Sequence, residues 1–269
     1  MSSQKHAVLG RTGLSVSRLG IGSGYGVQSK AVEKAYHEYG VNYFFWSSPR
    51  RKGMQEAIQK LAVTEREKLV IAIQTYDHVG LTMRHFVEKG LRALNLEFAD
   101  ILILGWFNQI PGNRVIKTAL KLKEEGKIRF LGISGHNRNV FGQIAGKADS
   151  PIDVFMVRYN AVHRGAEKDI FPYLSDLSDK SEKNRPGIVT YTATCWKKLL
   201  NPKKMPPEEH PLTSTECYRF ALSNPNVNLC LTGPKNQKEM NEALLALKSP
   251  FLSSGEMERV KRIGDYIHG

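Results

Sequence analysis

The sequence predicts an α/β barrel, because short strand-like runs alternate with helix-like segments eight times along the chain. Each run is rich in Ile, Val, Leu, Phe or Tyr and has few charges inside it, as expected for parallel strands that helices cover. Alternation of this kind produces a parallel sheet with right-handed crossovers, and eight units in 269 residues match a (β/α)8 TIM barrel. We therefore expect residues 1–269 to form a single barrel domain.

The strand-like runs share β-branched and aromatic composition and end in polar residues. The expected strands are Leu19–Ser23, Asn42–Trp46, Leu69–Gln74, Asp100–Leu104, Ile128–Ser134, Asp153–Tyr159, Gly187–Thr192 and Val227–Thr232. The expected helices are Ser29–Tyr39, Leu81–Asn95, Val115–Glu125, Glu167–Leu177, Thr213–Leu222, Gln237–Leu247 and, as an extra C-terminal helix, Ser254–Tyr266. Ser29 is the expected N-cap of the first helix, and Gly40 is its expected C-terminal glycine.

An N-terminal β-hairpin is expected before the first strand. Ala7–Leu9 and Ser15–Leu19 flank a turn that contains Gly10 and Gly13, and this hairpin could plug one end of the barrel. A doubly wound open sheet is the competing fold. It is disfavoured because Gly20–Gly24 lacks the third glycine of a dinucleotide-binding G-x-G-x-x-G turn.

Composition excludes several classes of protein. The formal charge is +13, but it is spread along the chain without a block of like charges, so we do not expect nucleic-acid binding. No apolar run approaches the length of a membrane span, and the first ten residues lack the apolar core of a signal peptide, so we expect a cytoplasmic protein without a membrane partner. Cys195, Cys217 and Cys230 are too widely spaced for a metal site, and we expect reduced thiols in or near the core.

The barrel fold locates the chemistry at the carboxyl ends of its strands. These ends are polar, aromatic and basic, and almost without carboxylates. Such a rim suits an anionic, partly aromatic ligand such as a nucleotide, and it suits neither a divalent metal nor a glycosidase mechanism. The cations expected to contribute to the rim are Arg50, Arg51, Arg138, Arg164 and Lys235.

Several motifs in register carry a resemblance to a known family. The segment Leu9–Gly20 resembles the opening hairpin of the aldo-keto reductases, and Gly126–Ser134 resembles the fifth strand of that family. Asp153–Asn160, Val189–Tyr191 and Leu231–Asn236 follow in the family's order and spacing. The resemblance implies a barrel that binds NADP(H), or less often NAD(H), and reduces the carbonyl group of a small molecule by hydride transfer.

The resemblance also implies a catalytic tetrad, and this chain departs from it. The family places an Asp, a Tyr, a Lys and a His at the ends of the second, third and fourth strands. The corresponding positions hold Phe45, Arg50, Gln74 and Gly105. An arginine stays protonated at neutral pH, so Arg50 is not an acid. The catalytic residues therefore stay unknown, and the rim residues that could supply a proton are Tyr76, His78, His136, Tyr159 and His163, with His163 and Arg164 also forming a candidate anion clamp.

The cofactor side is better matched to the family. The resemblance implies that Tyr191 stacks on the nicotinamide, that Ser134 contacts its carboxamide, and that Met156 stands where the family has a Gln. Thr192 and Thr194 fall in the loop that faces the pyrophosphate. Gly233, Lys235 and Asn236 open a helix whose free N–H groups favour phosphate, with Lys235 a candidate partner of a 2′-phosphate and Glu239 one turn further.

Two functions stay open from the sequence. One is an NAD(P)(H)-binding oxidoreductase that acts on an unidentified carbonyl substrate. The other is a catalytically inactive barrel that serves as a cofactor-sensing or protein-binding module.

Overall fold

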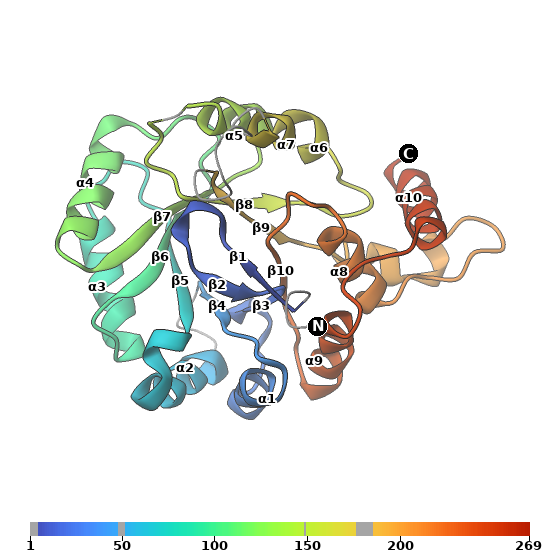
Figure 1. The fold of residues 1–269 in the computed structure, drawn as a ribbon, viewed down its shortest axis with the longest axis horizontal. Helices are drawn as coiled ribbons and strands as arrows, with labels where there is room; N and C mark the ends of the chain where they lie inside the picture. Colours follow the sequence, from blue (N-terminus) through green and yellow to red (C-terminus); the bar gives the residue numbers. More distant parts are fainter. Residues whose placement is uncertain (1–4, 48–51, 148, 176–184) are drawn as a thin grey trace.

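A closed barrel of eight parallel strands forms the centre of the molecule, and helices surround it (Figure 1). The computed structural model describes residues 5–47, 52–147, 149–175 and 185–269. Neighbouring strands follow one another along the chain, and the last strand pairs with the first. The barrel strands are β3 (Leu19–Gly22), β4 (Tyr43–Trp46), β5 (Val70–Thr75), β6 (Ala99–Leu104), β7 (Ile128–Ser134), β8 (Val154–Arg158), β9 (Gly187–Tyr191) and β10 (Leu229–Thr232). This confirms the predicted barrel and excludes the open sheet.

Side chains alternate along each strand between the barrel interior and the helical shell. On β4, Tyr43 and Phe45 belong to the interior cluster, whereas Phe44 and Trp46 pack against the helices. The interior is filled by apolar side chains, so it is a packed core without a channel. The alternation also determines which residue at each strand end points toward the barrel mouth.

The helical shell contains two helices that the sequence analysis did not predict. These are α2 (Lys52–Glu65) and α5 (Arg138–Ala145), so Arg138 begins a helix and does not lie in a loop. The predicted helix Glu167–Leu177 is wrong as a single element: it is interrupted at Ile170, and Leu177 lies outside the described residues. The other helices are α1 (Ser29–Tyr39), α3 (Met83–Leu94), α4 (Asn113–Glu124), α6 (Ala166–Asp169), α7 (Phe171–Ser175), α8 (Ser214–Leu222), α9 (Gln237–Leu244) and α10 (Ser254–His268).

The ends of α1 test the predicted caps. Gln28 occupies the N-cap position, and the hydroxyl of Ser29 instead donates to Glu33 Oε1 at 2.6 Å, so the predicted Ser29 cap is wrong. Gly40 adopts the left-handed conformation, with φ 72°, and ends the helix as predicted.

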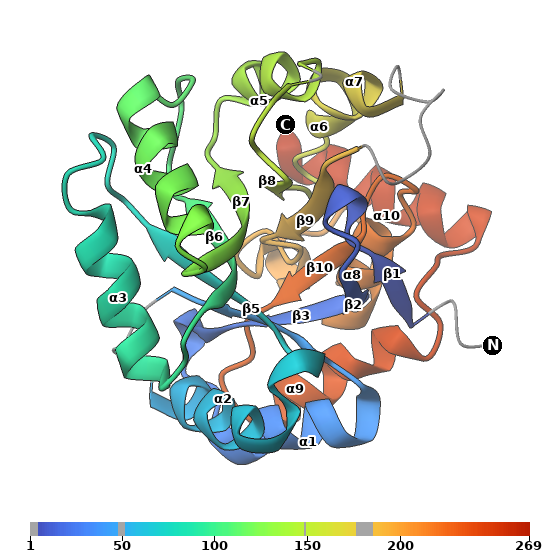
Figure 2. The ribbon, with the colours of Figure 1, turned by 60° about the vertical axis from the view of Figure 1, so that its left-hand side comes forward.

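The N-terminal hairpin covers the amino-terminal end of the barrel. It consists of β1 (His6–Val8) and β2 (Ser15–Ser17), and its Leu9 and Val16 belong to the interior cluster. The amide of Arg11 donates to the carbonyl oxygen of Arg185 at 2.7 Å, just before β9 begins. The hairpin therefore covers the end of the barrel opposite the carboxyl ends of the strands, and its blue ribbon lies beside the barrel strands in both ribbon views (Figures 1 and 2).

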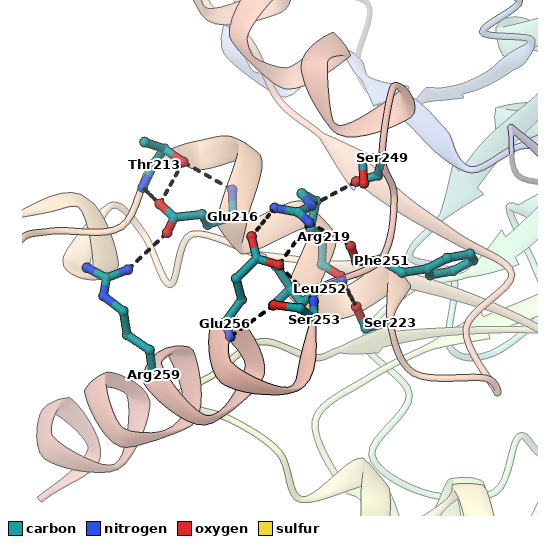
Figure 3. A network of polar contacts seen from close by, with 10 residues as sticks. All are labelled: Thr213, Glu216, Arg219, Ser223, Ser249, Phe251, Leu252, Ser253, Glu256 and Arg259. Atoms are coloured by element: carbon teal, nitrogen blue, oxygen red, sulfur yellow. Dashed lines mark hydrogen bonds and ion pairs between the residues drawn. The ribbon is translucent and has the colours of Figure 1, made fainter.

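Polar contacts attach the extra helix α10 to α8, as Figure 3 shows. Arg219 of α8 donates to Glu256 Oε1 at 2.6 Å, and Arg259 of α10 donates to Glu216 Oε1 at 2.9 Å. Both glutamates also complete capping boxes at the start of their own helices. This network, together with the close approach of Gly264 to Ala161, holds α10 against the loop after β8.

The described part of the chain has no helix with the length and hydropathy required to cross a bilayer. Cys195, Cys217 and Cys230 are all buried and unpaired, which confirms the predicted core thiols.

Candidate functional site

A cleft of about 840 Å³ opens at the carboxyl ends of β9 and β10. Six of the seven predicted cofactor-binding residues line it: Tyr191, Thr192, Thr194, Gly233, Lys235 and Asn236. They come from two separate loops and from the start of α9, so only the closed barrel brings them together. We call this space the β9–β10 cleft.

The inner end of the β9–β10 cleft is apolar. Phe45, Met156 and Leu231 form this end together with the half-buried ring of Tyr191. Burial raises the pKa of Tyr191, so its hydroxyl stays protonated at neutral pH. A flat aromatic ring fits against such a surface better than a charged group does.

Ser134, the seventh predicted residue, lies beside the cleft and not on its wall. It neighbours Met156 in the barrel register and is 4% exposed. Its hydroxyl accepts a hydrogen bond from Gln74 Nε2 at 3.2 Å, and its carbonyl oxygen accepts one from the amide of Phe107 at 2.8 Å. The hydroxyl of Ser134 accepts from Gln74, so its own proton is the group that it could still donate to a ligand.

The loop after β9 owes its shape to unusual backbone angles. Thr192, Cys195, Trp196 and Lys197 all have positive φ. The buried side chain of Asn160, in the loop after β8, donates to the carbonyl oxygen of Thr192 at 2.8 Å. Asn160 therefore fixes the first residue of this strained loop, which lines the cleft.

A carboxylate already occupies the phosphate-favouring N-terminus of α9. The amide of Lys235 donates to Glu239 Oε2 at 2.9 Å, and Lys197 Nζ lies 2.9 Å from Glu239 Oε1. The hydrogen bond from Lys197 is the main reason that the pKa of Glu239 is lowered, so the side chain is ionised at neutral pH. Asn236 caps the same helix by accepting from the amide of Glu239 at 3.0 Å. Any external anion at this helix end must compete with Glu239.

Gly233 makes room for an aromatic ring at the edge of the cleft. A Cβ atom at Gly233 would overlap the ring of Tyr25, which is 55% exposed and also lines the cleft. The loop after β3 thereby meets the loop after β10.

The neighbouring strand ends, at β4, β5 and β6, carry Phe45, Gln74 and Gly105. Tyr76 donates from its hydroxyl to Gln74 Oε1 at 3.1 Å. A Cβ atom at Gly105 would overlap both Gln74 Nε2 and the ring of Tyr76, so these two side chains fill the space beside the glycine. Arg50 lies outside the described residues.

The other candidate proton donors have different partners. His78 stacks on Phe107, with Nε2 3.0 Å from the carbonyl oxygen of Gly105. His136 is exposed. The hydroxyl of Tyr159 is directed away from the mouth and donates to Glu167 Oε1 at 2.6 Å. Burial raises the pKa of Tyr159 far above its usual range. Of the five, Tyr76 is the one that contacts the Gln74–Ser134 pair.

The predicted anion clamp of His163 and Arg164 does not form. Arg164 is paired with Asp265 of α10. His163 Nδ1 lies 3.2 Å from Asn160 Oδ1. Burial, reinforced by nearby cations, lowers the pKa of His163 to about 4, so the ring is neutral at physiological pH.

Three residues near the mouth received no role from the sequence. Trp196 and Lys197 line the cleft, and Arg158 is the last residue of β8, paired in register with Tyr191. The signal for Trp196 and Lys197 was their position in the loop that follows β9. The signal for Arg158 was its place at the end of β8, in the two-residue period that starts at Val154. Among the residues with described positions, no group of three His, Cys, Asp or Glu side chains could hold a metal ion.

Comparisons with known proteins agree with this architecture. Residues 28–192 match the model of the aldo/keto reductase family. An L-galactose dehydrogenase of Arabidopsis thaliana is 26% identical over 229 residues, which cover 76% of this chain and 69% of the relative. The uncharacterized oxidoreductase YqkF of Bacillus subtilis is 22% identical, with 94% of each chain covered.

Solved structures share the fold at lower identity. An aldo-keto reductase of Klebsiella pneumoniae in complex with NADPH has a TM-score of 0.76 at 19% identity, with 97% of this chain and 95% of that chain covered. The holo form of an aldo-keto reductase from Bacillus halodurans has a TM-score of 0.76 at 18% identity, with 96% of each chain covered. The barrel fold and the match to the family model together define an oxidoreductase fold family. The chain belongs to the aldo/keto reductase family.

Proposed function

We propose that the β9–β10 cleft binds a nicotinamide nucleotide and that the chain is an oxidoreductase acting on a small carbonyl compound. The observation that carries the proposal is the convergence of six predicted cofactor residues on one cleft at the open end of the barrel. The Klebsiella relative that shares the fold contains NADPH, which supports the same class of ligand.

The properties of the cleft fit the parts of such a nucleotide. The apolar inner end beside Tyr191 accommodates the nicotinamide ring, and the outer end offers backbone N–H groups and lysines for phosphates. Glu239 distinguishes the two cofactors, because the 2′-phosphate of NADP(H) would compete with this carboxylate for the amide of Lys235. NAD(H) has no such group, so it enters without displacing Glu239.

Tyr76 is the proposed contact for the substrate oxygen. When bound, the nicotinamide supplies the hydride that adds to the carbonyl carbon. Tyr76 holds a hydroxyl proton at the Gln74 side chain, and it can donate that proton to the new alkoxide and recover one from solvent. Partial burial raises the pKa of Tyr76, and no lysine with a described position is paired with it to oppose that effect. We therefore expect slow turnover compared with an enzyme whose tyrosine is acidified.

A second candidate function is a nucleotide-binding module without catalysis. It is favoured by the chemistry of Phe45, Gln74 and Gly105, which occupy the strand ends where the family resemblance places charged and acidic groups. None of the three supplies a proton or forms an ion pair. In this case the nucleotide would act as a signal read by a protein partner.

One experiment separates the two functions. Purified protein is mixed with NADPH or NADH and a panel of aldehydes and quinones, and the absorbance of the reduced nicotinamide is followed. Turnover that falls at least about tenfold in Tyr76→Phe supports the oxidoreductase with Tyr76 as donor. Nucleotide binding without any turnover supports the module. The control variant is Tyr173→Phe, because Tyr173 is an exposed tyrosine on α7, which does not line the cleft.

A further inference from the structure

Arg158 ends β8 on the side of the strand that faces the barrel interior. Val154 and Met156 belong to the interior cluster, whereas Phe155 and Val157 pack outward. The same alternation places Arg158 inward, at the mouth, where it pairs in register with Tyr191. A cation therefore stands next to the inner end of the β9–β10 cleft.

This arginine has no anionic partner among the described residues. Two other arginines near the mouth with described positions are paired, Arg138 with Asp169 and Arg164 with Asp265. Arg158 is half-buried and lies over the ring of Trp196, with Cζ 5.7 Å from the ring centroid. A guanidinium within cation–π range of an aromatic ring keeps its N–H groups available for two parallel hydrogen bonds to an anion.

The surroundings of Arg158 are positive, and the nearby carboxylates are already engaged. Lys198 and Arg138 act with Arg158 on the same imidazole, that of His163. Besides the two paired aspartates, Glu167 accepts the hydroxyl of Tyr159. Among the described residues of this part of the mouth, Arg158 and Lys198 therefore have no carboxylate partner, and an anion from solution would meet uncompensated positive charge here.

We propose that Arg158 binds an anionic oxygen group of the substrate, a carboxylate or a phosphate monoester, while an apolar or aromatic part of the same molecule lies against Trp196. The inference rests on the proposed function, since it makes the substrate an anionic carbonyl compound whose reacting carbon lies near Tyr191. Arginine suits this role because its planar donor pair matches a carboxylate or a phosphate.

The test compares two anionic aromatic ligands with a neutral one, and benzoate and benzamide have nearly the same shape. Benzoate, phenyl phosphate and neutral benzamide are titrated into the ¹⁵N-labelled full-length protein, and the indole N–H signal of Trp196 is followed. We expect benzoate or phenyl phosphate to bind at least about tenfold more tightly than benzamide. Arg158→Gln should abolish this preference. Arg158→Lys should keep part of it, because lysine retains the positive charge but lacks the planar pair of N–H donors. Arg92→Gln, an exposed cation on α3, should change nothing.

A second readout excludes a merely structural role for Arg158. An anion bound at Arg158 offsets the cations around His163, so benzoate should raise the pKa of His163, measured from its ring proton shifts. An equal affinity for benzoate and benzamide, or a preference that survives in Arg158→Gln, would overturn the inference.

Nucleotide titrations on the same proteins separate this inference from the proposed function. Arg158-dependent benzoate binding without NADH or NADPH binding would support the anion site and contradict the proposed function. Nucleotide binding with no Arg158-dependent anion preference would support the proposed function and contradict the anion site.

Discussion

Replacement of Glu239 tests how the cleft distinguishes its two candidate cofactors. In the structure, the carboxylate of Glu239 accepts hydrogen bonds from the amide of Lys235 and from the ammonium group of Lys197, both at 2.9 Å. A 2′-phosphate directed at the same amide must displace this carboxylate and approach its negative charge. Glu239→Gln removes the charge but keeps the size of the side chain.

The magnitude follows from the hydrogen bonds that are exchanged. A hydrogen bond to a charged group contributes about 1.5–3 kcal/mol when it is shielded from water. The side chain of Glu239 is 32% exposed and that of Lys197 is 56% exposed, so screening reduces the contribution. We expect Glu239→Gln to improve NADPH binding by about 1–2 kcal/mol, which is about 5- to 30-fold, and to leave NADH binding nearly unchanged.

The assay is fluorescence titration of each reduced nucleotide at fixed ionic strength, and the ratio of the two dissociation constants is the readout. The matched control is Glu242→Gln, because Glu242 also lines the cleft but its carboxylate accepts from the amide of Ser214. An unchanged NADPH-to-NADH ratio in Glu239→Gln would refute this account of the helix terminus, as would an equal change in Glu242→Gln.

Three further predictions concern the barrel mouth. Gly135→Ala should lower the free energy of unfolding by about 1–3 kcal/mol in urea titrations, because the new Cβ would overlap the backbone oxygen of Phe107. Gly105→Ala should lower it less but reduce turnover, because its Cβ displaces the flexible side chains of Gln74 and Tyr76. Equal losses of stability in the two variants would contradict this. The pH profile of kcat/KM for carbonyl reduction should be flat between about pH 6 and 9, because burial raises the pKa of Tyr76 above its ordinary value. A break in the profile within that interval would implicate another acid. The free energy of unfolding should fall as the pH is lowered from 6.5 toward 4, because His163, with a folded pKa of about 4, takes up its proton only on unfolding; a His163→Asn variant with the same pH slope would refute this.

Much of the fold could be predicted because helix and strand periods are local properties of the sequence. The predicted strand Ile128–Ser134 has the observed bounds of β7, and Gly40 ends α1 as expected. The missed helix α2 carries a helical spacing of buried residues at Met54, Ile58 and Leu61, so its signal was present. The Ser29 cap failed because the hydroxyl finds Glu33 one turn later, a competing contact that spacing alone does not exclude.

The candidate site was predictable in position but less so in chemistry. The rule that barrel chemistry lies at strand ends predicted Tyr191 and Lys235 at the barrel mouth, and both line the β9–β10 cleft. The neutralisation of the α9 terminus depends on Lys197 and Glu239, which are 42 residues apart and meet only after two loops have folded. The pairing of Arg164 with Asp265 likewise depends on where α10 docks. Such contacts are tertiary, so a sequence pattern does not reveal them.

The central claim is that the β9–β10 cleft holds a nicotinamide nucleotide, and direct titration tests it most plainly. NADH and NADPH are added to the unmodified protein while the nucleotide fluorescence is recorded, and the titration is repeated with Tyr191→Ala. We predict saturable binding of at least one nucleotide with a dissociation constant below about 100 μM, weakened at least about tenfold in the variant. The absence of binding of both nucleotides at several hundred micromolar, or equal binding by Tyr191→Ala, would contradict the account.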